Sequence, residues 1–288
     1  TMVVTKRKID VCPDWHQWIL LSGDWHVGNP DTDYGRLREE LQEAKVRNAL
    51  ITANGDIFDA LTAKHPYYLP TGVHKRLVER TDGMEGALDW ALELCDPVKD
   101  NLAIIGLGNH DLWCARNGFD PVLRLVKTLR RDGSGVEYGD IEGALRLSFV
   151  SPPRTYWSAD IWRHHGAGGN SPVTKGITDF SRMWPRLPDA KIIQLGHKHN
   201  RFIDTMRRTR WTADGNVYGE DCLSVMAGAY MEPHKSMTSD DILTRGRRSN
   251  YATDGNMAPQ SMGGVWVKLS PRSSKGGPID VTVELSLS

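Results

Sequence analysis

Five short polar clusters stand out along this chain, and each lies at the end of an apolar run. Together they hold six of the ten histidines, and none of them contains a cysteine. In chain order they are Asp24-Trp25-His26, Gly55-Asp56-Ile57-Phe58-Asp59, Gly108-Asn109-His110-Asp111, His164-His165-Gly166 and Gly196-His197-Lys198-His199. Carboxylates, amide oxygens and imidazoles are ligands of borderline-hard divalent cations. The five clusters therefore predict a metal centre.

The spacing within the clusters suits ligands at strand ends. Side chains at positions i and i+2 of a strand point to the same face, so the pairs Asp24/His26 and His197/His199 can each reach neighbouring ions. Glycines just before the ligands let the chain turn sharply out of each strand. Ligands gather at the carboxyl ends of strands in an α/β sheet. The candidate ligands are Asp24, His26, Asp56, Asn109, a histidine of the fourth cluster, His197 and His199.

Seven ligands are too many for one tetrahedral ion, but they suit two ions that share a carboxylate. In two-metal hydrolytic sites the ions lie about 3.5–4 Å apart and stabilise the attacking and leaving oxygens. We therefore expect two divalent cations as cofactors. The absence of thiolates favours Mn²⁺, with Fe, Zn, Ni or Mg as alternatives.

The elements that must position these clusters alternate between strand and helix in the first half of the chain. Buried-strand patterns cover 18–21, 49–53 and 102–107, and helical patterns cover 33–49, 81–94 and 121–130. This alternation predicts an α/β fold with an initially parallel sheet. Beyond Gly133 the expected strands are 144–150, 158–163, 190–195, 201–210, 216–229, 264–270 and 281–288, with a helix at 177–184 and a surface loop at 236–260. Clusters in both halves predict a single domain, 1–288, whose site spans two sheets.

Composition narrows the classes of function. The 36 basic and 36 acidic residues balance, so no global field attracts nucleic acid or an anionic membrane. The four cysteines are far apart and form no CxxC pair, which indicates reduced, mainly packing residues of a cytoplasmic protein. No segment reaches transmembrane length, so we expect no membrane partner. Two arginine clusters, 207–210 and 245–248, are interpreted as a solvated face and a loop, with phosphate-backbone contact as the alternative.

The ordered set DxH, GDxxD, GNHD, H and GHxH resembles the calcineurin-like metallophosphoesterase superfamily. The resemblance extends from Asp24 to His199, and the tail loosely resembles uncharacterised phosphoesterases of phages and bacteria. It implies a four-layer αββα sandwich: two mixed sheets face to face, helices outside, and a dinuclear site at the carboxyl ends of the strands. It also implies that a metal-bridging hydroxide attacks the phosphoester.

The resemblance also implies a role for each residue of the clusters. Asp24, His26 and His199 would bind one metal, and Asp56 would bridge the two. Asn109, His197 and the histidine of the fourth cluster would bind the other metal. His110 would protonate the leaving oxygen, and Asp59 would accept a hydrogen bond from His110 and keep it protonated.

Two positions depart from the family pattern or leave a choice open. Ala60 stands where the family often has arginine after GDxxD. The fourth cluster offers both His164 and His165, and we choose His165 because the family's ligand is commonly followed by glycine, here Gly166. The histidines outside the clusters are interpreted as surface or packing residues, although the segment 65–68 is an equal candidate for a pocket wall. They are His16, His65, His74 and His234.

Together these features predict a metal-dependent hydrolase of phosphoesters, a metallophosphoesterase. A phosphodiester is the leading substrate, because His110 suits alkoxide leaving groups, and phosphomonoesters follow. The alternative is a DNA or RNA nuclease of the same superfamily, with nucleic acid as its substrate. A metal-bound scaffold without turnover is disfavoured because His110 and Asp59 are both present. The sequence leaves the oligomeric state open.

Overall fold

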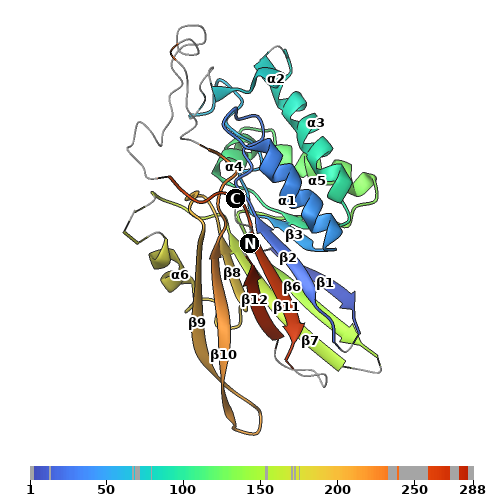
Figure 1. Cartoon of the computed structure of the whole chain (residues 1–288). Helices are drawn as coiled ribbons and strands as arrows, with labels where there is room; N and C mark the ends of the chain where they lie inside the picture. The colour runs from blue at the N-terminus through green and yellow to red at the C-terminus, as the bar shows by residue number, and fades with distance from the viewer. Residues whose placement is uncertain are drawn as a thin grey trace.

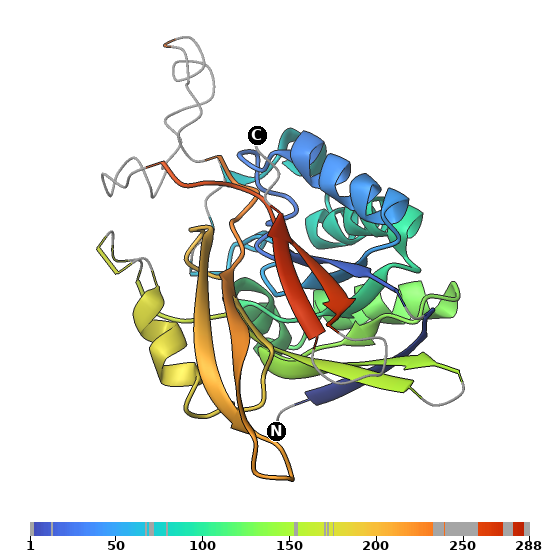
Figure 2. The ribbon, with the colours of Figure 1, turned by 60° about the horizontal axis from the view of Figure 1, so that its bottom comes forward.

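The computed structural model describes residues 3–12, 14–66, 68, 72–78, 80–152, 155–169, 171, 173–174, 176–232, 239, 259–272 and 279–284. Two mixed six-stranded sheets pack against each other, with most helices on one side (Figures 1 and 2). Leu21 from one sheet and Phe149 from the other belong to the same buried apolar cluster. The structure is therefore an α/β sandwich with two mixed sheets, as the sequence predicts.

The first sheet has the strand order β12-β11-β2-β3-β4-β5. Its strands β2 to β5 are parallel, whereas β11 runs antiparallel to both β2 and β12. The bounds are β2 Gln17–Ser22, β3 Leu50–Ala53, β4 Leu102–Ile105, β5 Glu137–Tyr138, β11 Val265–Pro271 and β12 Ile279–Glu284. The short central strands β3 and β4 are almost wholly buried, which explains their unbroken apolar runs.

Helices cover the outer face of the first sheet (Figure 1). Two of them begin at residues that favour a helix start: the Asp33 side chain caps α1, and the Asp120 side chain caps α5 just before Pro121. The apolar sides of α1, α3 and α5 enter one cluster with Leu20 and Ile51 of the sheet. The bounds are α1 Tyr34–Val46, α2 Lys75–Val78, α3 Gly83–Cys95, η2 Asp96–Val98, α4 Asn109–Arg116 and α5 Pro121–Arg131.

The second sheet has the strand order β1-β6-β7-β8-β10-β9. The pairs β6/β7 and β9/β10 are antiparallel, and β1/β6, β7/β8 and β8/β10 are parallel. The bounds are β1 Val3–Asp10, β6 Glu142–Ser151, β7 Thr155–His164, β8 Ile192–Leu195, β9 Phe202–Trp211 and β10 Val217–Met226. Its outer face packs against α6, Ile177–Met183, through Phe180, Trp162 and Ile193. Among the described residues this short helix is the outer helical layer of the second sheet.

Five described elements have no counterpart in the sequence prediction: β1, α2, η2, α4 and β5. Strand β1 carries four charged residues, Lys6, Arg7, Lys8 and Asp10, and is an edge strand, so it lacks the apolar run that marks its neighbours. Helix α4 begins at Asn109, within the third cluster, where the sequence suggested a turn out of the strand. The predicted surface loop at 236–260 and the last four residues of the predicted strand 281–288 lie largely or wholly outside the described residues.

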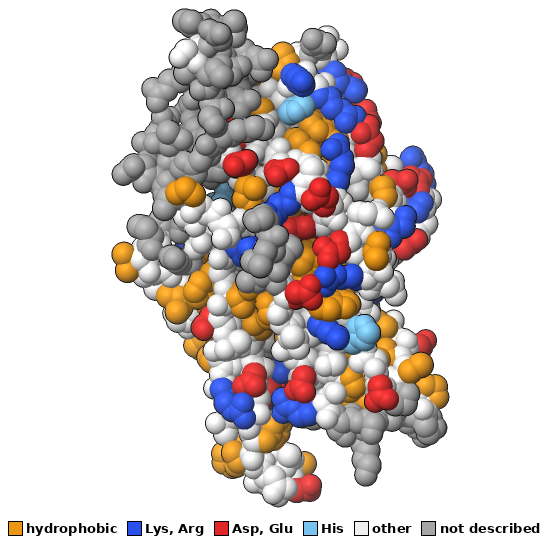
Figure 3. All heavy atoms as spheres, in the orientation of Figure 1, with side chains coloured by type: hydrophobic (Ala, Val, Ile, Leu, Met, Phe, Trp, Pro, Cys, Tyr) orange, Lys and Arg blue, Asp and Glu red, His pale blue; other side chains and the backbone are white. Residues whose placement is uncertain are grey.

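The structure also bears on the expected state of the cysteines, on membrane-spanning helices and on the surface charge. All four cysteines are free, and three are buried, but Cys12 is exposed. No helix within the described ranges is long and apolar enough to cross a bilayer. Basic and acidic side chains are interspersed on the face shown in Figure 3.

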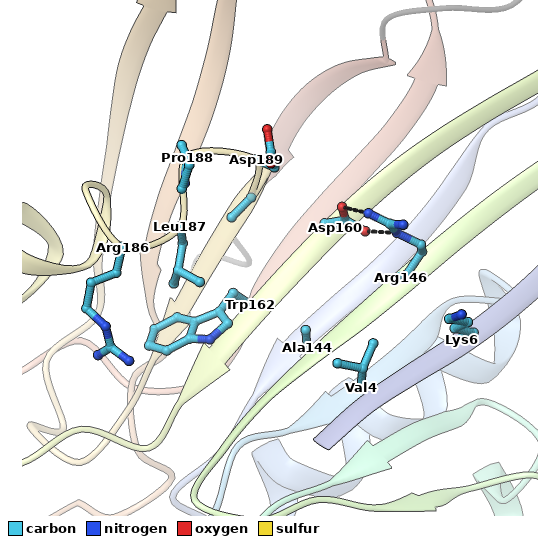
Figure 4. A pocket seen from close by; sticks show the side chains of 11 residues that line it. Val4, Lys6, Ala144, Arg146, Asp160, Trp162, Arg186, Leu187, Pro188 and Asp189 are labelled. Atoms are coloured by element: carbon cyan, nitrogen blue, oxygen red, sulfur yellow. Dashed lines mark hydrogen bonds and ion pairs between the residues drawn. The ribbon is translucent and has the colours of Figure 1, made fainter. Parts of the chain in front are cut away.

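A cavity of about 330 Å³ opens on the outer face of the second sheet, beside Trp162 and the paired side chains of Arg146 and Asp160 (Figure 4). It contains no member of the five clusters.

Candidate metal centre

The five clusters meet at one end of the two sheets. The first three follow β2, β3 and β4 of the first sheet, and the last two follow β7 and β8 of the second. Backbone hydrogen bonds join them: the His197 N–H donates to the Asp24 carboxylate at 3.1 Å, and the His110 N–H donates to Asp56 Oδ1 at 2.9 Å. Residues that are 173 positions apart in sequence are thereby held side by side.

Asp24, His26 and His199 form one group of candidate ligands. One ligand atom from each lies within 4.8 Å of the other two. The Nε2 atoms of His26 and His199 are 3.1 Å apart, and His199 Nε2 lies 3.6 Å from Asp24 Oδ1. Asp24 and His26 are buried, so this group is closed on the protein side.

Asp56, His165 and His197 form a second group on the same distance criterion. Asn109 adds an amide oxygen to it, 2.7 Å from His197 Nδ1 and 3.1 Å from His165 Nε2. Asp56 lies between the two groups: its Oδ2 is 3.2 Å from His165 Nε2 and 3.9 Å from His26 Nε2. A single carboxylate thus faces both sets of ligands.

Backbone carbonyl oxygens orient the rings of His165 and His197. His165 Nδ1 lies 2.8 Å from the Asn54 carbonyl oxygen, and His197 Nε2 lies 3.1 Å from the Gly168 carbonyl oxygen. A carbonyl oxygen can only accept, so these nitrogens carry the hydrogens. The remaining nitrogen of each ring then presents a lone pair to the oxygen of Asn109. Lone pairs that face oxygens at such distances repel unless a cation or proton lies between them, and rings fixed in this way are typical of metal ligands.

The pKa shifts of His165 and Asp56 in the second group also fit a metal site. Burial disfavours the charged form of His165, but the Asp56 carboxylate outweighs it and raises the pKa of His165 to about 10. Despite burial, His165 and His110 lower the pKa of Asp56 well below its usual range. Without metal, a proton on His165 therefore offsets the Asp56 charge at neutral pH. A bound divalent cation could compensate the Asp56 charge in place of that proton, so these donor groups suit a divalent cation.

His110 and Asp59 lie beside the first group. Asp59 Oδ1 is 3.3 Å from His110 Nδ1 and 3.2 Å from His26 Nδ1, while its Oδ2 accepts a hydrogen bond of 2.7 Å from the Asn29 amide. Although burial opposes ionisation, the hydrogen bonds from His110 and His26 lower the pKa of Asp59 well below its usual range. The charged carboxylate therefore holds both rings by Nδ1 and leaves their Nε2 atoms for other partners.

Only one histidine of the fourth cluster points into the site. His165 is fully buried and contacts Asp56 and Asn109. His164 is the last residue of β7; its Nδ1 accepts a hydrogen bond of 2.8 Å from the Gly166 N–H, and its ring stacks on Trp162. Successive side chains on a strand face opposite sides, which separates the two rings. The structure thus turns His165 toward Asp56 and Asn109 and turns His164 away from them.

The backbone is unusual at the clusters, because five candidate ligands have left-handed φ angles. These are Asp24 (51°), His26 (47°), Asp56 (46°), His197 (71°) and His199 (52°). A non-glycine residue rarely adopts this conformation, which costs roughly 1–3 kcal/mol and concentrates at functional sites. Gly55 also needs its φ of 85°, and a side chain there would lie 2.5 Å from the Gly108 nitrogen.

Four further residues support the site; of these, only His65 was suggested by the sequence, as part of a candidate pocket wall at 65–68. The buried Asp111 carboxylate accepts hydrogen bonds from the backbone of Ile57, Phe58 and Gly108, which ties the second cluster to the third. The other three hold or border site histidines: Asn54, Asn29 and His65. Asp111 was visible in the third cluster, but nothing in the sequence shows where its bonds go.

The remaining candidates lie away from the clusters. His16 is exposed, and His74 packs against Trp90 with ring centroids 4.8 Å apart. Ala60, in place of the family's arginine, is buried. The first arginine cluster forms ion pairs with acidic neighbours, as expected of a solvated face: Arg207 with Asp221, Arg208 with Glu220, and Arg210 with Asp189 and Glu220. The second arginine cluster, 245–248, and His234 lie outside the described residues.

Comparisons with known proteins give weak similarities. No protein-family model matches the chain, and no curated protein matches it. A predicted phosphoesterase from Streptococcus pneumoniae TIGR4 is similar in structure, at 12% identity and a TM-score of 0.32, over 94% of this chain and 99% of that one. GAP50 of Plasmodium, described as the anchor in the inner membrane complex, is similar at 11% identity and a TM-score of 0.41, over 93% of this chain and 84% of that one. Neither similarity is close enough to decide a function.

Proposed function

We propose that this protein is a metal-dependent hydrolase that cleaves phosphoesters, most readily phosphodiesters. The observation that supports it best is the position of Asp56 between two groups of ligands, with His110 held by Asp59 at their edge. The resemblance of the five clusters to calcineurin-like metallophosphoesterases supports the same reaction. Because each metal group takes residues that follow strands of both sheets, we also interpret the chain as one domain.

The proposed ligands divide as the distances do. Asp24, His26 and His199 would hold one divalent cation, and Asn109, His165 and His197 would hold the other, while Asp56 faces both ligand groups. The two cations would supply an activated water and neutralise charge on the phosphoester oxygens. Mn²⁺ is the favoured metal because the ligands are oxygen and imidazole groups without thiolate.

His110 supplies the proton for the leaving oxygen. Its Nδ1 lies 3.3 Å from the Asp59 carboxylate, so Nε2 is the nitrogen that would donate to the leaving oxygen. Asp59 stays ionised despite its burial and therefore keeps a negative charge beside the ring. A positioned acid of this kind contributes about 10²–10⁴-fold to the rate. It matters most for an alkoxide leaving group, which is why a phosphodiester is favoured.

A nuclease of the same superfamily is the second candidate. It needs a continuous basic groove to follow the phosphate backbone. The described arginines at 207, 208 and 210 are paired with acidic side chains, which reduces their attraction for phosphate. The observations therefore favour a small phosphoester over a polynucleotide.

The test is a metal-supplemented screen. The purified protein is stripped with chelator, returned to Mn²⁺, and assayed on bis-p-nitrophenyl phosphate, p-nitrophenyl phosphate, cyclic nucleotides and a labelled oligonucleotide. Metal-dependent turnover, abolished in Asp56→Asn and retained in the exposed control His16→Ala, is the expected result. Equal activity in excess chelator, or no turnover of any ester at full metal loading, would overturn the proposal.

A further inference from the structure

We infer that His65 is a positioning residue that holds the His110 imidazole in the orientation from which it donates its proton. The inference rests on the proposed function. It adds a residue that lies outside all five clusters and outside both groups of candidate ligands. In this role His65 acts through its ring face, and it exchanges no proton with the substrate.

The contact between the two rings is close and well buried. The rings of His65 and His110 stack with centroids 5.1 Å apart and planes inclined by 26°. His65 is only 4% exposed, so solvent does not compete for that face of His110. Offset stacking at this distance is a favourable arrangement of two flat rings.

His65 is itself fixed in place. Its N–H donates to the Thr62 carbonyl oxygen at 2.8 Å, and its carbonyl oxygen accepts from the Tyr68 N–H at 3.0 Å, so a tight turn presents the ring. The His65 ring also meets Trp113, with centroids 4.7 Å apart and planes inclined by 60°. Trp113 lies one turn after His110 on α4 and therefore on the same side of the helix. His65 thus fills the space between its own turn and α4.

Three neighbours together restrict the His110 ring. Asp59 holds its Nδ1 at 3.3 Å, His26 meets it edge-on at 5.0 Å and 87°, and His65 covers one face. A hydrogen bond at one nitrogen leaves the ring free to tilt about that bond. Packing on a face removes this freedom, so His65 supplies a constraint that Asp59 cannot. A small misplacement of a catalytic group can cost about 100-fold in rate.

The test compares His65→Ala, which removes the stack, with His65→Phe, which keeps a flat ring without nitrogen. Each is assayed on bis-p-nitrophenyl phosphate and on a dinucleotide, whose leaving oxygen is an alkoxide. We expect His65→Ala to lose about 10- to 100-fold on the dinucleotide and less than about threefold on the aryl ester, at unchanged metal content. His65→Phe should restore most of the dinucleotide activity, and His16→Ala should match wild type on both.

Two further measurements exclude a merely structural role. In a His110→Ala background, His65→Ala should cause no additional loss on the dinucleotide, because coupled residues are not additive. Nitrogen-detected NMR of the metal-free protein should show one set of His110 ring signals in wild type and averaged ring signals in His65→Ala.

The possible results distinguish the positioning role of His65 from the proposed hydrolase function. Equal losses on both substrates, additive losses with His110→Ala, or a failure of His65→Phe to rescue would overturn the role of the stack while leaving a metallophosphoesterase in place. Absence of metal-dependent turnover in the wild type on either ester would instead overturn the proposed function.

Discussion

Nδ1 of His110 lies 3.3 Å from Oδ1 of Asp59, and that same oxygen lies 3.2 Å from Nδ1 of His26. One carboxylate therefore orients both a candidate metal ligand and the candidate general acid. The Asn29 amide holds the other oxygen of Asp59 at 2.7 Å, so the carboxylate cannot rotate without losing a bond. The position of this one residue therefore affects both the candidate metal ligand His26 and the candidate acid His110.

If His110 acts as an acid and not as a ligand, as we propose, His110→Ala should slow the reaction by about 10²–10⁴-fold while both metals stay bound. The loss should be large for a dinucleotide and small for an activated nitrophenyl ester, since nitrophenolate leaves without a proton. Asp59→Asn should show a milder form of the same pattern. Rates on both substrates at matched metal content measure this. If both substrates suffer equally, or if metal is lost, the acid assignment is wrong.

Asp56→Asn should lower the occupancy of both metals, whereas His199→Ala should mostly empty one. The reason is that Asp56 faces both ligand groups and its charge offsets the repulsion between two nearby cations. Elemental analysis after dialysis against a fixed Mn²⁺ concentration gives the number of ions per chain. Near-complete loading of Asp56→Asn would show that this carboxylate does not bridge.

His165→Ala should abolish most of the activity, and His164→Ala should change it less than about threefold. His165 is buried against Asp56 and Asn109, while His164 stacks on Trp162 on the opposite side of β7. The two variants form a matched pair, because each removes one imidazole and the two positions are adjacent in the sequence. Metal content and turnover measured together check the assignment, and the reverse ranking would transfer the ligand role to His164.

Much of this site was accessible from sequence because its signals are local. Apolar runs that end in polar clusters marked β2, β3, β4, β7 and β8. The carboxyl ends of strands then brought the clusters together without any knowledge of the long-range contacts. The fourth cluster shows the limit of this reasoning, since glycine after His165 was the sole local signal that separated it from His164.

The features that the sequence did not predict depend on the surrounding structure and on contacts between distant segments. His65 reaches His110 across 45 positions of sequence, and no spacing rule links a turn after β3 to a helix after β4. The left-handed φ of Asp24, His26 and Asp56 was equally invisible, because the strained conformation is imposed by the surrounding structure. Strand β1 was missed since an edge strand can be polar on the side that faces solvent.

Metal affinity should rise with pH between 7 and 9. Burial opposes protonation of His26 and His165, but Asp59 and Asp56 outweigh it and raise their pKa values to about 9 and about 10. Both rings thus carry protons at neutral pH in the metal-free protein, and a bound cation must displace them. Each displaced proton makes the apparent affinity rise about tenfold per pH unit. Calorimetric Mn²⁺ titrations in buffers of different ionisation enthalpy count the protons released.

The same pKa values predict the stability of the metal-free protein. A group with a raised pKa in the folded state stabilises it fully below its unfolded pKa, near 6.5 for histidine, and that contribution disappears as the pH passes the folded value. His26 and His165 should therefore contribute less and less from pH 7 to pH 10. Melting temperatures in excess chelator should fall over this range more steeply than those of the Mn²⁺-loaded protein. Parallel curves would contradict the assignment of protons to these rings.

Replacing His199 should separate stability from function. Its φ of 52° is left-handed, so glycine relieves strain there and alanine does not. We expect metal-free His199→Gly to be more stable than His199→Ala by about 1 kcal/mol, which corresponds to a difference of about 2–4 °C in melting temperature. Both variants should lose one metal and most of the activity, because both lack the imidazole.

The matched control is Lys45, an exposed position within α1, where the order should reverse. There glycine weakens the helix by about 1 kcal/mol relative to alanine, so Lys45→Gly should melt below Lys45→Ala. Chemical denaturation in excess chelator gives the four free energies of unfolding on one scale. If alanine is as stable as glycine at position 199, the left-handed backbone there is not strained.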